Sequence, residues 1–113
     1  QARWGTRIFN FSLNIPEPVA EDAYSVYAAR LDEIAEAHNV IFVISAGNLR
    51  ENPRPEWPET EAGALAAIAA GRNDGIEMPA ESARNIAVGA LNPPDLSSCI
   101  AYAPACYTRR GPG

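Results

Sequence analysis

Asn48 is the residue of this chain that is best placed to do chemistry. It follows a run of five large apolar residues at 40–44 and the short turn Ser45-Ala46-Gly47. Such a run, mostly β-branched, is typical of a strand that is buried on both faces in the middle of a parallel sheet. An asparagine at the end of a rigid strand can direct its side-chain NH2 group at a negative charge that develops during a reaction.

The elements that must position Asn48 are predicted from the residues before it. Residues 7–13 are predicted to form a first strand, which ends at Asn14 because two prolines follow at 16 and 18. The spacing of apolar residues changes over 19–38 and predicts a helix. Strand, helix and strand form a βαβ unit, so Asn14 and Asn48 both lie just past the carboxyl ends of neighbouring parallel strands. Open α/β sheets bind their ligands at that edge.

The predicted helix has recognisable ends. It opens with the acidic residues Glu21 and Asp22 and closes with His38-Asn39. Acidic side chains at the start and a histidine followed by an asparagine at the end both favour a helix.

Several shorter elements are predicted after Asn48. Prolines make the segment after Asn48 loop-like, and Gly89 is expected where two backbone segments pack closely. We expect a short helix over residues 59–70, a turn over 72–75, a third strand over 85–91, and a short strand or extended segment near 100–103.

Composition limits the classes of function. The chain has 113 residues, 47% of them hydrophobic, which is enough for one globular domain. Its net charge of −5 without a basic stripe disfavours nucleic-acid binding, and no apolar segment is long enough to span a membrane. Cys99 and Cys106 could form a disulfide or remain two thiols. A zinc site is disfavoured because the one histidine is far away in sequence.

Four segments of the chain resemble one family in the same order. Ile8-Phe9-Asn10-Phe11-Ser12-Leu13-Asn14 is followed by Ser45-Ala46-Gly47-Asn48, then by Met78-Pro79-Ala80 leading into Asn85-Ile86-Ala87-Val88-Gly89-Ala90, and finally by Tyr107-Thr108-Arg109-Arg110-Gly111-Pro112-Gly113. Together they resemble the central part of subtilisin-like serine proteases, the subtilases of the peptidase S8 family. The resemblance implies an α/β, three-layer subtilisin-like fold, of which this chain holds part.

The segments that carry the family's catalytic Asp, His and Ser do not occur in the sequence. The patterns D-[ST]-G, H-G-T and G-T-S-M-A are missing, His38 ends a predicted helix, and neither Ser12 nor Ser45 lies in a nucleophile motif. We therefore interpret residues 1–113 as the central fragment of a peptidase domain, with a family-atypical insert at 49–77. The parent is expected to be a serine endopeptidase and the fragment alone to be inactive.

The resemblance assigns roles to seven residues. Asn48 corresponds to the oxyanion-hole donor. The alternative is that Asn48 only tolerates a left-handed backbone after Gly47, and we favour the oxyanion role. The other six correspond to substrate-binding residues: Ser12, Leu13 and Asn14 would pair with the substrate backbone, and Ser45, Ala46 and Gly47 would form a pocket wall. Asn14 stands where the family usually has glycine.

The resemblance also implies partners and surroundings. A polypeptide substrate and the remainder of the catalytic domain are the expected partners, with no nucleic acid and no membrane. Self-association of the fragment is expected because its strands would have exposed edges. An extracellular or periplasmic location fits the family. No cofactor is expected.

Three smaller expectations concern loops and charges. The Met78-Pro79 bond is expected to be cis, as it often is in the family. Carbonyls near Ala80, Ser82 and Asn85 match a weak cation site, such as a calcium site, in some subtilases, but we favour an ordinary loop. Arg109 and Arg110 are expected to be solvated surface charges.

Two alternatives from other classes remain. The chain could be a non-catalytic α/β module that binds peptides or small ligands at the same strand edge. A nucleotide-binding Rossmann-type domain is poorly supported, because the prolines and Glu17 stand where a glycine-rich phosphate loop would be.

Overall fold

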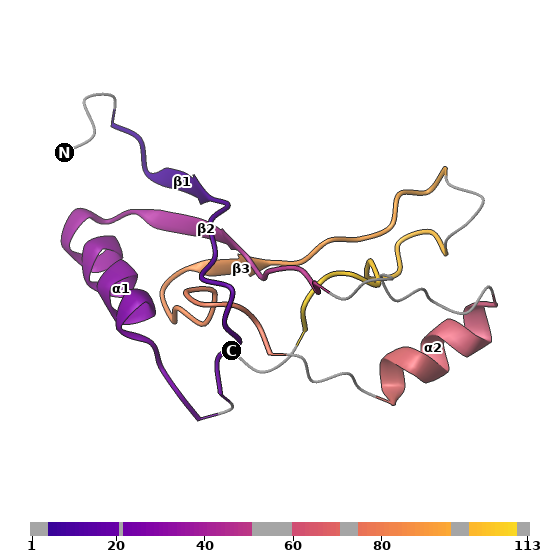
Figure 1. The fold of residues 1–113 in the computed structure, drawn as a ribbon. Coiled ribbons are helices and arrows are strands. Elements are labelled where there is room, and N and C mark those ends of the chain that lie inside the picture. The colour runs from indigo at the N-terminus through magenta and orange to yellow at the C-terminus, as the bar shows by residue number, and fades with distance from the viewer. Residues whose placement is uncertain (1–4, 21, 51–59, 71–74, 96–99, 111–113) are drawn as a thin grey trace.

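The computed structural model describes residues 5–20, 22–50, 60–70, 75–95 and 100–110 (Figure 1). Its elements, in chain order, are β1 (Ile8–Phe11), α1 (Val26–His38), β2 (Ile41–Ser45), α2 (Glu61–Ala69) and β3 (Ile86–Val88). The strands form a parallel sheet in the order β1-β2-β3, so β2 is central. This confirms the predicted α/β fold and its βαβ unit.

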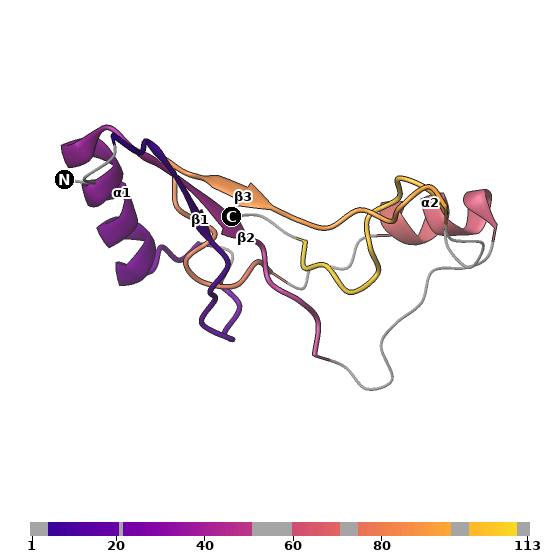
Figure 2. The ribbon, with the colours of Figure 1, turned by 90° about the horizontal axis from the view of Figure 1, so that it is seen from above.

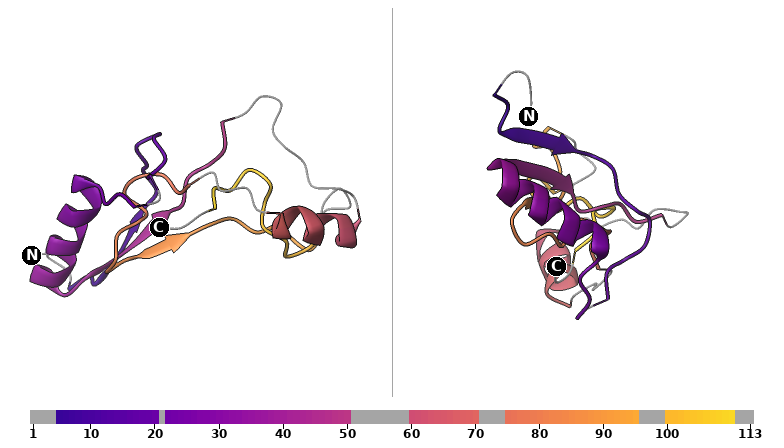
Figure 3. Two further views of the ribbon diagram at one scale, coloured as in Figure 1. Left: turned by 90° about the horizontal axis from the view of Figure 1, so that it is seen from below. Right: turned by 90° about the vertical axis from the view of Figure 1, so that its left-hand side faces the viewer.

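Helix α1 covers one face of the sheet (Figure 3). The Phe9 and Phe42 rings lie side by side on adjacent strands, with centroids 5.6 Å apart. Next to them the core is built from Leu31 of α1, the fully buried Ile44 of β2, and small or apolar residues of later loops, namely Ala46, Ile76 and Ala80. The core therefore lies at the carboxyl end of β2, where it supports the residues that follow the strand.

The opposite face of the sheet is apolar and open among the described residues. Register partners on parallel strands point to the same side, and Ile8, Ile41, Ile86 and Val88 share that side. Their exposed fractions are 66%, 40%, 51% and 46%. The prediction that the strand of β2 is buried on both faces is therefore wrong at Ile41, because α1 covers only one face.

Helix α1 is shorter than predicted. It begins at Val26, where the Ser25 hydroxyl caps it by accepting a hydrogen bond from the Ala28 amide at 3.1 Å. The predicted acidic opening is wrong, since Asp22 lies before the helix and Glu21 lies outside the described residues. The predicted end is confirmed: Asn39 follows the helix in a left-handed conformation, with φ 50°.

Beyond the sheet, the segments after β2 and β3 extend in the same direction (Figure 2). The segment that follows β3 pairs with a segment nearer the C-terminus: the Ala105 amide donates to the Ala90 carbonyl at 2.8 Å. The extended segment predicted near 100–103 is instead a turn, in which Tyr102 has φ 62°. Gly89 does lie at a close approach, but to a side chain and not to another backbone segment, because a Cβ there would lie 3.1 Å from the Thr108 hydroxyl.

Helix α2 confirms the short helix predicted over 59–70, within the described residues. It lies well away from α1 and from the three strands (Figures 1 and 2). Of the turn predicted over 72–75, only Gly75 is described, and it has φ +63°. None of the helices in the described ranges is long and apolar enough to cross a membrane.

Candidate functional site

Asn48 lies just past the carboxyl end of β2, as predicted. The strand ends at Ser45, and the Ala46 amide extends the pairing by donating to the Val88 carbonyl at 2.9 Å. Gly47 then turns the chain with φ +94°. Positive φ values outside glycine occur at Asn39 and Tyr102 among the described residues, and not at Asn48. The turn therefore uses the glycine, and Asn48 is not there to tolerate a left-handed backbone.

The backbone on both sides of Asn48 is held by the segment 107–109. The Leu49 amide donates to the Tyr107 carbonyl at 2.7 Å, and the Arg109 amide donates to the Gly47 carbonyl at 3.0 Å. These bonds form an antiparallel bridge between Asn48 and Thr108. Asn48 itself is exposed, and no described residue hydrogen-bonds to its side chain. Its NH2 group is thus carried on a fixed backbone and is open to an external acceptor.

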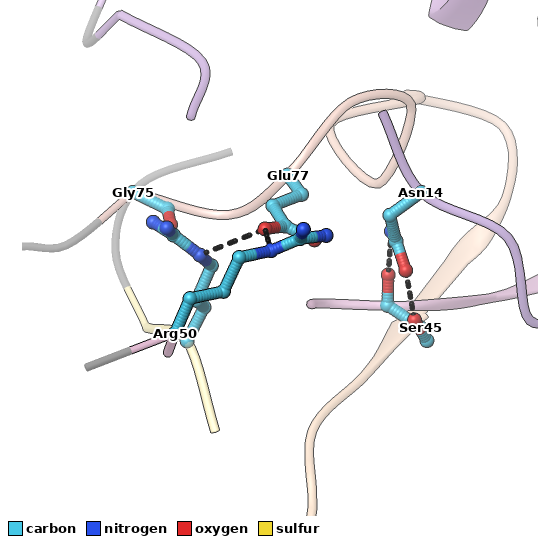
Figure 4. A network of polar contacts seen from close by, with 6 residues as sticks. Asn14, Ser45, Arg50, Gly75 and Glu77 are labelled. Carbon is cyan, nitrogen blue, oxygen red and sulfur yellow. Dashed lines mark hydrogen bonds and ion pairs between the residues drawn. The ribbon is translucent and has the colours of Figure 1, made fainter. Parts of the chain in front are cut away.

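Asn14 and Ser45 meet across the two parallel strands, as Figure 4 shows. The Asn14 amide donates to the Ser45 carbonyl at 2.6 Å, and the Ser45 hydroxyl donates to the Asn14 side-chain oxygen. Both polar groups of Asn14 are therefore engaged inside the protein. A glycine at position 14 could not make these hydrogen bonds, whereas Asn14 links the segment after β1 to the end of β2.

The other predicted substrate-binding residues are spread along this edge. The Ser12 hydroxyl donates to the Asn10 side-chain oxygen at 3.0 Å, and the neighbouring Leu13 is 72% exposed. Ala46 and Gly47 are buried. The structure therefore brings Asn14, Ser45, Ala46 and Gly47 together, whereas Ser12 and Leu13 are exposed just after β1.

Glu77 is a member of this site that the sequence reasoning missed. Its side chain is only 3% exposed, and its carboxylate oxygen Oε1 lies 3.2 Å from Nε of Arg109 and 3.8 Å from Nε of Arg50 (Figure 4). The one available signal was an acidic residue inside the otherwise apolar sequence Gly75-Ile76-Glu77-Met78-Pro79. A buried carboxylate needs a cation or several donors beside it.

The expectation that Arg109 is a solvated surface charge is wrong. Its side chain is 13% exposed, it pairs with Glu77, and its Nη1 donates to the Gly75 carbonyl at 3.2 Å. The physical reason is the buried carboxylate of Glu77, which draws the guanidinium inside. Arg110 is half-buried.

Comparison with known proteins gives one match. A sequence model of the subtilase family, peptidase S8, matches residues 2–112. The chain belongs to the subtilase family. No curated protein and no solved structure matches it. Membership of the subtilase family implies a serine peptidase whose substrates are polypeptides.

Two further expectations from the subtilase resemblance concern the loop before β3. The Met78-Pro79 bond is cis, as predicted. The loop 82–85 turns its hydrogen-bond donors toward Asp32 of α1, which accepts from the Ser82 hydroxyl at 2.5 Å and from the Arg84 amide at 2.9 Å. That the backbone carbonyls near Ala80, Ser82 and Asn85 belong to an ordinary loop and not to a cation site stays a prediction.

The one histidine and the described cysteine of the chain are not close partners of Asn48 in sequence. His38 is the last residue of α1, so it precedes β2, whereas Asn48 follows β2. The whole of β2, five residues and roughly 17 Å long, lies between the two. Cys106 is a free, half-buried thiol, and Cys99 lies outside the described residues.

Proposed function

We propose that residues 1–113 are the central part of a subtilase catalytic domain and that Asn48 is its oxyanion-hole donor. The observation that supports this best is an exposed side-chain amide, free of described partners, on a backbone fixed from both sides by residues 107–109. A serine that attacks a peptide carbonyl creates a negatively charged oxygen. A donor that is already in place stabilises this oxygen without reorganisation.

The same edge would bind the substrate. Residues 12–14 follow the edge strand β1, and in this proposal the substrate backbone adds to them as a further strand. Ser45, Ala46 and Gly47 would form the wall of the pocket for the side chain before the cleaved bond. Asn14 acts here indirectly, because its amide already holds the Ser45 carbonyl.

The catalytic Asp, His and Ser would come from sequence that flanks this chain. The single histidine lies at the wrong end of β2, and the Ser45 hydroxyl is bonded to Asn14. We therefore propose that the 113 residues alone do not hydrolyse peptides. Proteolysis by the purified chain that is abolished by a serine-directed inhibitor would contradict this.

The insert and the partners belong to the same proposal. Residues 49–77 would be a family-atypical insert, and α2 within it lies away from the sheet. The remainder of the catalytic domain would cover the open sheet face, and copies of the isolated chain would associate through it.

The decisive experiment is kinetic. In the full-length protein, Asn48→Ala should lower kcat by roughly 10²–10³-fold with little change in KM, the loss known for such a donor in subtilisin itself. Asn39→Gly is the matched control, because it removes an asparagine from a left-handed position at the other end of the sheet. An unchanged kcat in Asn48→Ala would remove the oxyanion assignment. Peptide binding without any turnover would favour the non-catalytic binding module.

A further inference from the structure

We infer that Glu77 and Arg109 are a positioning pair that fixes the turn carrying Asn48. This inference rests on the proposed function, because its catalytic consequence requires Asn48 to be the oxyanion donor. The pair itself is a property of the structure and can be tested without any activity.

The pair is buried and close. The Glu77 and Arg109 side chains are 3% and 13% exposed, with Nε and Oε1 3.2 Å apart. Charges in such surroundings are weakly screened, so removing the charge of Glu77 takes a close counter-charge away from Arg109. Arg50 also approaches Oε1, at 3.8 Å, but its side chain is 66% exposed. Arg109 is therefore the main counter-charge of Glu77.

Both members of the pair also bind the backbone of the turn. The Glu77 amide donates to the Ala46 carbonyl at 3.0 Å, and the Arg109 amide donates to the Gly47 carbonyl at 3.0 Å. The turn is thus held at two consecutive carbonyls by two residues whose side chains form an ion pair with each other. A displacement of either side chain would be transmitted to the residue next to Asn48.

The Glu77 side chain packs directly against the turn. A Cβ built on Gly47 would lie only 2.6 Å from Oε2 of Glu77, so the carboxyl group occupies the space beside the Gly47 Cα. Meanwhile Nη1 of Arg109 reaches the Gly75 carbonyl at 3.2 Å. A continuous series of contacts therefore runs from the Gly75 carbonyl to the Arg109 guanidinium, then to the Glu77 carboxylate, and from there to Gly47 in the turn. Since a misplacement of about 1 Å can cost about 10²-fold in rate, this connection matters for a donor at Asn48.

The first test measures the turn directly. Glu77→Gln keeps the shape of the side chain and removes its charge. The Leu49 and Arg109 amides form the hydrogen bonds between the turn and residues 107–109. In the full-length protein we expect these two amides to exchange hydrogen at least about tenfold faster in this variant than in wild type. Glu36→Gln is the matched control, because Glu36 also pairs with an arginine at 3.2 Å, but both side chains are more than half exposed. Equal exchange rates in Glu77→Gln and wild type would overturn the inference.

The second test separates positioning from general damage. We expect Glu77→Gln to lower kcat by roughly 10- to 100-fold with little change in KM. In an Asn48→Ala background the same substitution should change kcat by less than about twofold, because the group that it positions is gone. An equal loss of kcat in both backgrounds would refute positioning.

A milder variant keeps the test valid if Glu77→Gln folds poorly. Arg109→Lys retains the charge but presents one ammonium group in place of the guanidinium fork, so its exchange rates and kcat should fall between those of wild type and Glu77→Gln. Values equal to wild type would count against the pair. A full-length protein without peptidase activity would refute the proposed function, and the exchange measurement would still decide the pair.

Discussion

The Asn14 amide and the Ser45 carbonyl, 2.6 Å apart, join the ends of two parallel strands through a side chain. The Ser45 hydroxyl donates back to the same asparagine, so the contact is reciprocal. Backbone hydrogen bonds hold the strands together within the sheet, whereas this contact joins the segment that follows β1 to Ser45, the last residue of β2. The turn that carries Asn48 starts one residue after Ser45.

Asn14→Gly should therefore destabilise the protein. Two partly buried hydrogen bonds are lost, each worth about 0.5–1.5 kcal/mol, so the free energy of unfolding should fall by about 1–3 kcal/mol. Denaturant unfolding followed by circular dichroism measures this. Asn10→Gly on β1 is the control, since Asn10 is exposed and accepts one hydrogen bond from Ser12. Equal losses in the two variants would show that the added backbone freedom of glycine, and not the two hydrogen bonds of Asn14, causes the loss.

Asp32→Asn should weaken the hydrogen bonds that hold the loop before β3 and so lower the stability of the protein. The Asp32 carboxylate accepts from the Ser82 hydroxyl and from the Ala83 and Arg84 amides, at 2.5, 3.1 and 2.9 Å. Hydrogen bonds to a charged acceptor contribute about 1.5–3 kcal/mol each, and partial exposure lowers that value, so we expect a loss of about 2–3 kcal/mol in total. Thermal and denaturant unfolding would detect it. Asp22→Asn, an exposed position before α1, should change stability by less than about 0.5 kcal/mol. A loss in Asp32→Asn no larger than in Asp22→Asn would show that these hydrogen bonds do not stabilise the loop.

Local sequence patterns predicted the parts of the fold that local chemistry decides. The apolar run that became β2 and the asparagine that ends α1 are set by burial and by backbone preference at single positions. The position of Asn48 followed from these, because parallel strands place their carboxyl ends together. The start of α1 differs from the prediction because two signals compete in the sequence. Acidic residues at 21 and 22 favour an earlier start, whereas Ser25 is a good N-cap and is the residue that caps the helix.

The supporting contacts of the site could not be predicted in the same way. Glu77 and Arg109 lie far apart in the chain, and Arg109 stands beside another arginine in a segment that reads as surface. Likewise, Asp32 meets Ser82 across 50 positions. Such pairs depend on how loops pack together, and neither periodicity nor composition carries that information. The same limit applied to the open face at Ile41, which an apolar run alone does not reveal.

Gly47→Ala should be more harmful than another glycine substitution at positive φ. At Gly47, with φ +94°, the added Cβ is strained and also meets the Glu77 side chain at 2.6 Å. Gly5 has φ +65° with nothing within 4 Å of an added Cβ, so Gly5→Ala reports the backbone strain alone, about 1–2 kcal/mol. We expect Gly47→Ala to lose at least about 1 kcal/mol more than the control in urea unfolding. Equal losses would mean that Glu77 moves aside freely, which would also weaken the argument for a positioning pair.

The open face of the sheet predicts that the 113-residue chain self-associates. Ile8 lies on the edge strand β1 and Ile86 on the edge strand β3, and they are 66% and 51% exposed on the same side. Exposed apolar faces beside unpaired strand edges favour association between copies. Sedimentation velocity at about 100 µM should therefore show dimers or larger species.

The double variant Ile8→Lys/Ile86→Lys tests whether this face is responsible. Two lysines on it should shift the chain toward monomer, because each would have to leave water when copies pack together. Val26→Lys is the matched control, as Val26 is 73% exposed but lies on the first turn of α1. Association that survives the double variant would place the contact elsewhere. A wild-type chain that stays monomeric at this concentration would show that the open face alone is too small or too polar, with Asn10 and Ser45 among its residues, to hold two copies together.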